Sequence, residues 1–324
     1  MLRYLARRLV WSVVLVAVVS SSAFVLTRLA PGDMTSEQVG SGVSSRTLDA
    51  ERERLGLSRP LATQYLDWAA RAVRLDLGTS LMYGRPVAAL VAERARNTAL
   101  LATVALFAAT LVGLPLGVIA GSRRGAASAL IQSGSLLVLS FPSLVSSLVL
   151  VFVAARTGWF PTGGMTSPDA IGGTWAAVAV DVARHLVVPA LALALPLSAT
   201  LERMQARAVA ETLSEPFVAA AAARGVPASR VLWRSALKPA LRPVAAIYGL
   251  VFGSLLSGSF VVEIVTSWPG LGRLMFDALR SRDLYLVAGC AAAGGVFLAL
   301  GALVSDAALA IVDPRIRHRV GAES

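Results

Sequence analysis

Long apolar runs, separated by shorter polar segments, dominate the chain. An α-helix needs roughly 20 mostly apolar residues to cross the hydrocarbon core of a bilayer. The pattern therefore predicts an all-α membrane protein with six transmembrane helices. The shortest run still approaches the lower limit of a span, since an α-helix rises about 1.5 Å per residue. The predicted spans are residues 9–26, 98–120, 130–155, 186–201, 244–262 and 284–304, the last extending to 312.

The polar segments between these runs divide the chain into a membrane core and smaller parts outside the membrane. The first run is longer than the roughly 7–15 apolar residues of a signal peptide, so we expect an uncleaved first span rather than a signal peptide. The expected parts are 1–30, the N-terminal tail and first span; 31–96, a small helical module outside the cytoplasm; 97–312, the remaining spans with a cytoplasmic loop at 202–243; and 313–324, a cytoplasmic tail.

Within the module, the spacing of apolar residues predicts a helix over 60–74. Ser58 precedes Pro60, which makes the serine the expected N-cap of this helix.

Composition excludes several classes of soluble protein. Of the 324 residues, 56% are hydrophobic and only 15% are charged, whereas soluble domains carry about 25% charged residues. Cys290 is the only cysteine, which excludes an intrachain disulfide. The chain has only two histidines, so few side chains are suited to a metal site or to acid–base catalysis. We therefore expect this chain to supply no catalytic residue, no cofactor-binding residue and no metal ligand.

Arginines flank the apolar runs and set the expected orientation in the membrane. The net charge is +11, and Lys238 is the one lysine among 30 basic residues. Nucleic-acid binding would require a clustered basic face with stacking aromatic residues, so we expect no nucleic-acid partner. With the N-terminus inside, the inner segments hold 15 basic residues and the two short outer loops hold five. Ten more arginines lie in the outer segment after the first span. That segment is longer than the roughly 60 residues over which loop charge controls orientation, so its arginines are not counted. Both termini are thus predicted to be cytoplasmic.

The loop at 202–243 contains the most informative local pattern. Pro216 suits the first turn of a helix, the alanines after it favour helix, and Gly225 with Pro227 ends it. The sequence predicts a short helix over 216–224, a glycine turn and a second helix on the inner membrane face. An interfacial helix that packs on the protein's own spans and a docking element for a cytosolic partner both fit this pattern.

The whole chain resembles the dipeptide/oligopeptide/nickel permeases of ABC importers, and in particular their B-type subunit. The inner loop resembles the EAA loop of ABC importer permeases, which favours the docking interpretation. The segments that carry the resemblance, in chain order, are 31–33, 55–60, 64–65, 76–80, 84–87, 158–161, 163–164, 185–189, 221–225, 234–241, Glu263, 268–274, and Asp306 with 313–317.

The resemblance implies the type I fold of ABC importer permeases and a division of labour between subunits. The chain has no Gly-x-x-x-x-Gly-Lys-Ser/Thr loop, since its single lysine does not stand in this motif. ATP and Mg²⁺ are therefore expected on two separate ATPase subunits or domains. The resemblance also implies a C-type permease subunit as the other half of the pore. An extracytoplasmic binding protein is expected to deliver the substrate, and the bacterial plasma membrane is the expected location.

In this resemblance, the helix at 216–224 is the coupling helix that docks on an ATPase subunit. The general EAA pattern has a glutamate where this chain has Ala219, so no docking ion pair is assigned to that position. The residues expected to dock are Glu215, Pro216, Phe217, Ala220, Ala221, Arg224 and Gly225.

A second group of residues lies at the expected outer end of the fifth span. We expect Glu263, Trp268, Pro269 and Gly270 to form an outer gate or a contact with the binding protein. For Glu263 a solvated cap or an ordinary loop contact is the alternative interpretation.

Two further residues stand inside predicted spans. Pro142 is expected to kink the third span, either as a fixed bend or as one that changes during gating. Asp306 lies near the inner end of the last span, where a buried carboxylate costs about 2.5–3.5 kcal/mol. Pairing with Arg315 or Arg317 gives Asp306 a structural role, and a role in transport is the alternative.

The expected function is that of an importer permease subunit that is not itself an enzyme and that forms half of the pore for di- or oligopeptides. Nickel or another small solute is the alternative substrate. A secondary transporter is a different class, but the chain lacks the inverted repeat and midplane charge typical of that class. A membrane hydrolase would need a base beside its nucleophile, and neither histidine is placed for that role.

Overall fold

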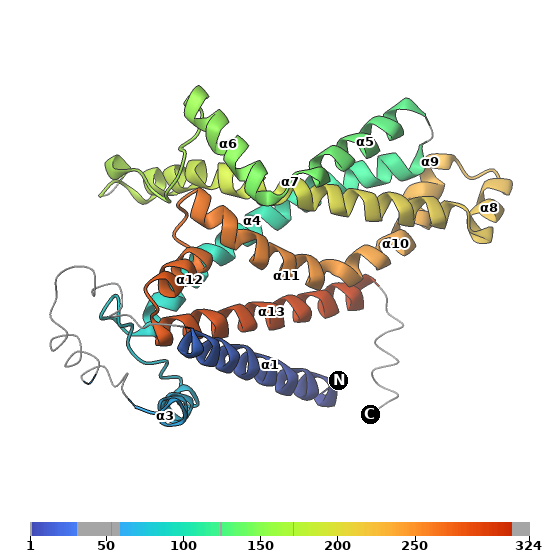
Figure 1. The fold of residues 1–324 in the computed structure, drawn as a ribbon. Coiled ribbons are helices and arrows are strands. Elements are labelled where there is room, and N and C mark those ends of the chain that lie inside the picture. The colour runs from blue at the N-terminus through green and yellow to red at the C-terminus, as the bar shows by residue number, and fades with distance from the viewer. Residues whose placement is uncertain (1, 31–52, 54–58, 124, 171, 313–324) are drawn as a thin grey trace. The chain divides into compact units, whose positions relative to one another are not determined.

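The computed structural model describes residues 2–30, 53, 59–123, 125–170 and 172–312. In these ranges the regular structure is helical, apart from one antiparallel bridge between Thr79 and Pro86 (Figure 1). The main helices are α1 (Leu2–Leu29), α3 (Leu61–Ala72), α4 (Val87–Ser122), α5 (Ala126–Ser140), α6 (Ser143–Thr157), α7 (Trp175–Leu213), α8 (Pro216–Ala223), α9 (Ala228–Arg230), α10 (Leu237–Ala240), α11 (Arg242–Val265), α12 (Leu271–Arg280) and α13 (Leu284–Val312).

Four helices are individually long and apolar enough to cross a bilayer, namely α1, α4, α7 and α13. Two bent pairs meet the same test together: α5 with α6, and the helical segment 228–253 with 258–265. By length and composition, the described residues therefore contain between four and six candidate spans, depending on whether each bent pair counts as one span. The predicted helical class is confirmed at this coarser level.

The third predicted span is not one kinked helix. α5 and α6 meet at a 97° bend between Ser140 and Ser143. Phe141 is extended, with φ −98° and ψ 118°, and Pro142 precedes the first residue of α6. Proline has no N–H to donate and disfavours helical geometry in the residue before it, so the helix breaks here. The apolar run continues across the break, which is why hydrophobicity alone predicted a single span.

The chain divides into two compact units, which we describe separately. The first comprises Met1–Tyr4, Ala99–Trp268 and Leu300–Ser324, and the second comprises Leu5–Thr98 and Pro269–Ala299. The boundaries between them in sequence fall within α1, within α4, between Trp268 and Pro269, and within α13.

The long helix α7 organises the first unit, because α5, α6, α10 and α11 all pack against it (Figure 1). It extends well beyond the predicted run 186–201, since Thr174 caps its start through a hydrogen bond from the Ala177 N–H and its last turns are polar. Gly113, Gly117 and Gly121 of α4 lie against the backbone of α7 at four-residue spacing. Small residues at this spacing let two helices approach closely.

The second unit is built around α12, the first turns of α4 and α13, and the contact of α3 with α1. Leu271, Leu274 and Ala278 form the buried face of α12 and pack in one cluster with the first turns of α4 and α13. Trp68 of α3 stacks on Phe24 of α1 at 5.1 Å between ring centroids. α3 confirms the helix predicted at 60–74, while Ser58, its expected N-cap, lies outside the described residues.

Candidate functional sites

The loop at 202–243 contains the predicted short helix. α8 spans Pro216–Ala223, with Pro216 in its first turn and Glu215 in an extended conformation as N-cap. Val218 and Ala221 face inward and are buried with Val231 and Ala236 of the following helix. The other residues of α8 are exposed, and the Phe217 side chain keeps 46% of its surface accessible.

This arrangement divides the residues that were expected to dock on a partner. Exposed side chains lie at Glu215, Pro216, Phe217, Ala220 and Arg224, and Gly225 is exposed as well. Ala221 does not belong with them, because it is 7% exposed and anchors α8 to its own loop. Helical periodicity places 218 and 221 on one face, a signal that was present in the sequence.

The end of α8 is a Schellman motif, in which a left-handed residue closes the helix. Gly225 has φ +78°, its N–H donates to the Ala222 carbonyl at 2.9 Å, and the Val226 N–H donates to the Ala221 carbonyl at 3.3 Å. Val226 packs on the same cluster as Ala221. These paired bonds and the apolar contact define the motif, in which glycine is preferred because it adopts positive φ without strain.

The second predicted helix of the loop follows Pro227. It runs through α9, a π-helical segment at Val231–Ala236 and α10, which includes Pro239 and ends at Ala240. Trp233 in the π-helical segment is 61% exposed. This residue was not among those expected from the sequence.

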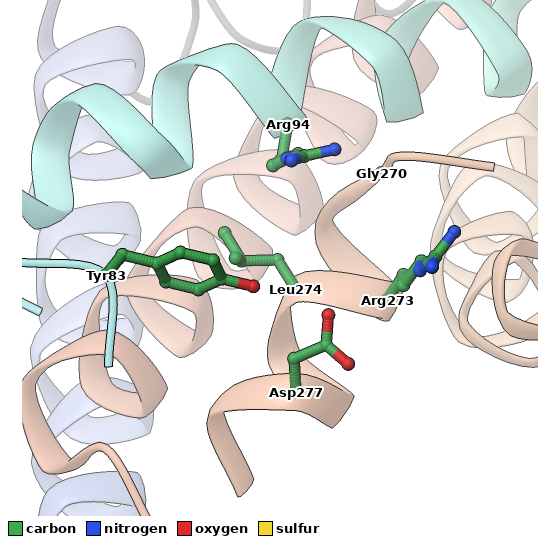
Figure 2. A pocket seen from close by; sticks show the side chains of 6 residues that line it. All are labelled: Tyr83, Arg94, Gly270, Arg273, Leu274 and Asp277. Atoms are coloured by element: carbon green, nitrogen blue, oxygen red, sulfur yellow. The ribbon is translucent and has the colours of Figure 1, made fainter. Parts of the chain in front are cut away.

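A pocket lies in the second unit, between the start of α4 and α12. It has a volume of about 230 Å³ and is lined by Tyr83, Arg94, Gly270, Arg273, Leu274 and Asp277. Figure 2 shows Arg94 on α4, and Arg273 and Asp277 on α12, around the space into which the Tyr83 ring extends. Of these residues, only Gly270 was expected from the sequence. Tyr83 and Arg94 are far in sequence from Arg273, Leu274 and Asp277 of α12, and only the fold brings the two groups together.

The pocket is polar, and its charges are mixed. The Arg94 Nε is buried and makes no hydrogen bond in the part of the chain that the structure describes. Burial, and after it the Asp277 carboxylate, raise the pKa of Tyr83 above its ordinary value. The Tyr83 hydroxyl therefore stays protonated at neutral pH and is able to donate a hydrogen bond.

The segment before α12 is fixed by two polar side chains of α4. Asn97 Nδ2 donates to the Pro269 carbonyl at 2.8 Å, and the Leu271 N–H donates to Thr98 Oγ1 at 2.8 Å. The Thr98 hydroxyl is buried, so this bond satisfies a helix N-terminus that would otherwise lack a partner. The position of Gly270 at the pocket is thus set by α4.

Glu263 and Trp268 are not among the residues that line this pocket. Both are 0% exposed, which makes the solvated cap considered for Glu263 wrong and gives neither side chain a surface for direct contact with a partner. Nearby, the Gly164 N–H donates to the Thr266 carbonyl at 2.9 Å, so the Gly163-Gly164 segment packs against the turn that follows α11.

Asp306 lies in α13 and is half-buried. Its expected partners Arg315 and Arg317 lie outside the described residues. Among those that are described, no group of three His, Cys, Asp or Glu side chains is arranged to hold a metal ion.

Asp283 anchors the loop that carries Tyr83, and the sequence analysis missed it. Its carboxylate is 0% exposed, and it accepts hydrogen bonds from Ser80 Oγ at 2.6 Å, the Met82 N–H at 3.0 Å and the Leu286 N–H at 3.1 Å. It joins the loop before α4 to the first turn of α13, two segments about 200 residues apart in sequence.

We expect Asp283→Ala to loosen this loop, because each buried donor left without a partner costs about 1–3 kcal/mol. Hydrogen exchange of residues 78–86 should accelerate by at least about tenfold, the equivalent of roughly 1.4 kcal/mol. Asp169→Ala, at an exposed aspartate in another loop, is the control and should leave this exchange unchanged. Unchanged exchange in Asp283→Ala would show that the carboxylate does not hold the loop.

Two family models match the chain. Residues 113–318 match the binding-protein-dependent transport system inner membrane component, and residues 1–101 match the N-terminal membrane component of the same systems. The chain is 33% identical to the oligopeptide transport system permease protein AppB of Bacillus subtilis, over 98% of this chain and 100% of that protein. It is 33% identical to the oligopeptide transport system permease protein OppB of Mycobacterium bovis, over 98% and 99%. It is 31% identical to the glutathione transport system permease protein GsiC of Escherichia coli, over 98% and 100%.

Proposed function

Because the chain belongs to the family of binding-protein-dependent transport system inner membrane components, we propose that it is the B-type permease subunit of an ATP-driven peptide importer. The relatives' names support a peptide substrate, since oligopeptide and glutathione systems both move peptide-like solutes. The proposed substrate class is therefore di- and oligopeptides.

The proposed topology has six spans, with each bent pair crossing the membrane once. The positive-inside distribution supports cytoplasmic termini, and the same orientation places the loop 202–243 inside and residues 31–96 outside. In this topology α8 faces the cytoplasm. The pocket between α4 and α12, which we call the outer pocket, faces the compartment from which a binding protein delivers substrate.

The observation that carries the mechanism is the exposed short helix α8, held by its buried face at Val218 and Ala221. A rigid helix attached in this way transmits motion to the spans beyond it. We propose that α8 docks in a groove of an ATPase subunit, with Phe217 as its apolar contact. ATP and Mg²⁺ bind on that subunit, and closure of the two ATPases moves α8 and turns the pore outward.

The complete importer is proposed to contain a C-type permease, two ATPase subunits or domains and an extracytoplasmic binding protein. The test is uptake by proteoliposomes that contain this chain and the subunits that co-purify with it. Uptake of a labelled tripeptide that requires internal ATP and external binding protein is the expected result. Uptake driven by an ion gradient without ATP would contradict the proposal, and uptake of ⁶³Ni²⁺ but not peptide would overturn the substrate class.

We further propose that the outer pocket receives an acidic side chain of the binding protein, supported by the buried Arg94 Nε that lacks a hydrogen-bond partner among described residues. The Arg94→Glu variant should raise the concentration of binding protein needed for half-maximal ATPase stimulation by about tenfold or more, because like charges oppose docking. Arg74→Glu, at an exposed arginine outside the pocket, is the matched control. Equal half-maximal concentrations in the two variants would remove Arg94 from the interface.

A further inference from the structure

A second hollow, in the first unit, is lined by three arginines. It has a volume of about 530 Å³ and lies between the end of α4, the start of α5 and the C-terminal half of α7. Arg123 follows α4, while Arg203 and Arg207 lie one turn apart on α7. None of the described lining residues is acidic, and no ion pair to these three arginines is formed by any residue that the structure describes.

The other side of the hollow is an anchored turn with further polar groups. Ser128 Oγ donates to the Ala120 carbonyl at 2.7 Å and accepts from Gln132 Nε2 at 3.0 Å, which fixes the start of α5 against the end of α4. Gly125 is the N-cap of α5 and provides no side-chain cap for its first N–H groups. The positive end of this helix therefore adds to the charge of the arginines.

Next to this charge, the surface of α5 is strongly apolar. Leu130 is 73% exposed and Leu137 is 65% exposed, and both belong to the bent pair that is long enough to cross a bilayer. A site with uncompensated arginines at one end and exposed leucines along one helix matches a ligand that has a phosphate head and acyl chains.

We propose that this hollow binds the phosphodiester of an anionic phospholipid, with Arg203 and Arg207 donating to the phosphate and Arg123 completing the site. Guanidinium groups bind phosphate oxygens in paired hydrogen bonds. Basic hollows between membrane helices on the cytoplasmic side are suited to anionic head groups. The inference rests on the proposed orientation, which places these arginines at the inner leaflet.

The test is native mass spectrometry of the full chain, purified with its co-purifying subunits, delipidated and titrated with phosphatidylglycerol. Wild type should bind phosphatidylglycerol about tenfold or more tightly than the Arg203→Gln/Arg207→Gln variant. The matched control is Arg230→Gln/Arg234→Gln, which removes two exposed arginines at the same four-residue spacing and should bind like wild type. Arg203→Lys/Arg207→Lys keeps the charge and should retain most of the binding, which separates loss of charge from misfolding.

Three other results would overturn the proposal. Equal binding of phosphatidylcholine with the same acyl chains would mean that the head-group charge is not recognised. Displacement of the lipid by millimolar inorganic phosphate would identify a free-anion site. A photo-cross-linking residue at the exposed position 132 should label lipid in the intact complex, and labelling of an acidic segment of another subunit instead would assign the arginines to a protein contact. None of these assays measures transport, so their outcome is independent of the uptake experiment.

Discussion

Gly225→Val should reduce ATP-dependent uptake by at least about tenfold while leaving the chain inserted in the membrane. Gly225 adopts φ +78°, and an added Cβ there would meet no atom within 4 Å. The cost of a side chain at this position is therefore backbone strain rather than a clash with a neighbouring atom. A β-branched residue in the left-handed conformation costs roughly 1–2 kcal/mol. We expect the Schellman motif to open and α8 to lose its fixed direction, because the bonds from Gly225 and Val226 hold its last turn.

Two variants distinguish this explanation from a general loss of stability. Gly225→Asn should retain most uptake, since asparagine tolerates positive φ better than valine does. Gly172→Val introduces the same strain at φ +87°, also with no atom within 4 Å, in a loop before α7. It should leave uptake close to wild type. If Gly225→Val transports like wild type, the end of α8 has no part in coupling.

Gly117→Leu should abolish recovery of folded protein, because α4 lies directly against α7 at this glycine. A Cβ at Gly117 would lie 2.6 Å from the Glu202 carbonyl oxygen and 2.6 Å from Gln205 Cβ. The backbones of α4 and α7 must separate to accept the side chain, and overpacking of this kind costs about 1–3 kcal/mol or more. Size-exclusion chromatography of a fluorescent fusion measures the monodisperse fraction.

The control is Gly134→Leu, another glycine-to-leucine change within an apolar helix, α5. A Cβ at Gly134 meets no atom within 4 Å, so the variant should give a peak close to wild type. A monodisperse peak of normal height for Gly117→Leu would show that α4 and α7 are not closely packed at this point.

Local signals in the sequence predicted much of the inner loop. Pro216, the alanine run and Gly225 each act within a few residues of the helix they define, and α8 lies within one residue of the predicted 216–224. Helical periodicity also predicts which face of α8 is exposed and which is buried, although Ala221 was expected to be part of the docking surface. Its burial depends on Val231 and Ala236, which fold back on it after the glycine turn.

Features that depend on tertiary contacts were harder to predict from the sequence. Hydrophobicity did not show the break at Pro142, because both sides of the bend are apolar. The outer pocket joins Tyr83 and Arg94 to residues about 180 positions later, and no local pattern connects them. The four-residue spacing of Gly113, Gly117 and Gly121 was a visible signal of close helix packing, but its partner on α7 followed only from the fold.

The central claim is that this chain couples to separate ATPases through α8. Quantitative mass spectrometry of the subunits that co-purify with the tagged chain from its native membrane tests it most directly, with Gly225→Arg and the control Gly172→Arg beside wild type. The account predicts a second permease and ATPases that carry the P-loop with wild type and control, and loss of the ATPases, but not of the second permease, with Gly225→Arg. Recovery of the chain alone, under detergent conditions that keep a known importer intact, would contradict the claim.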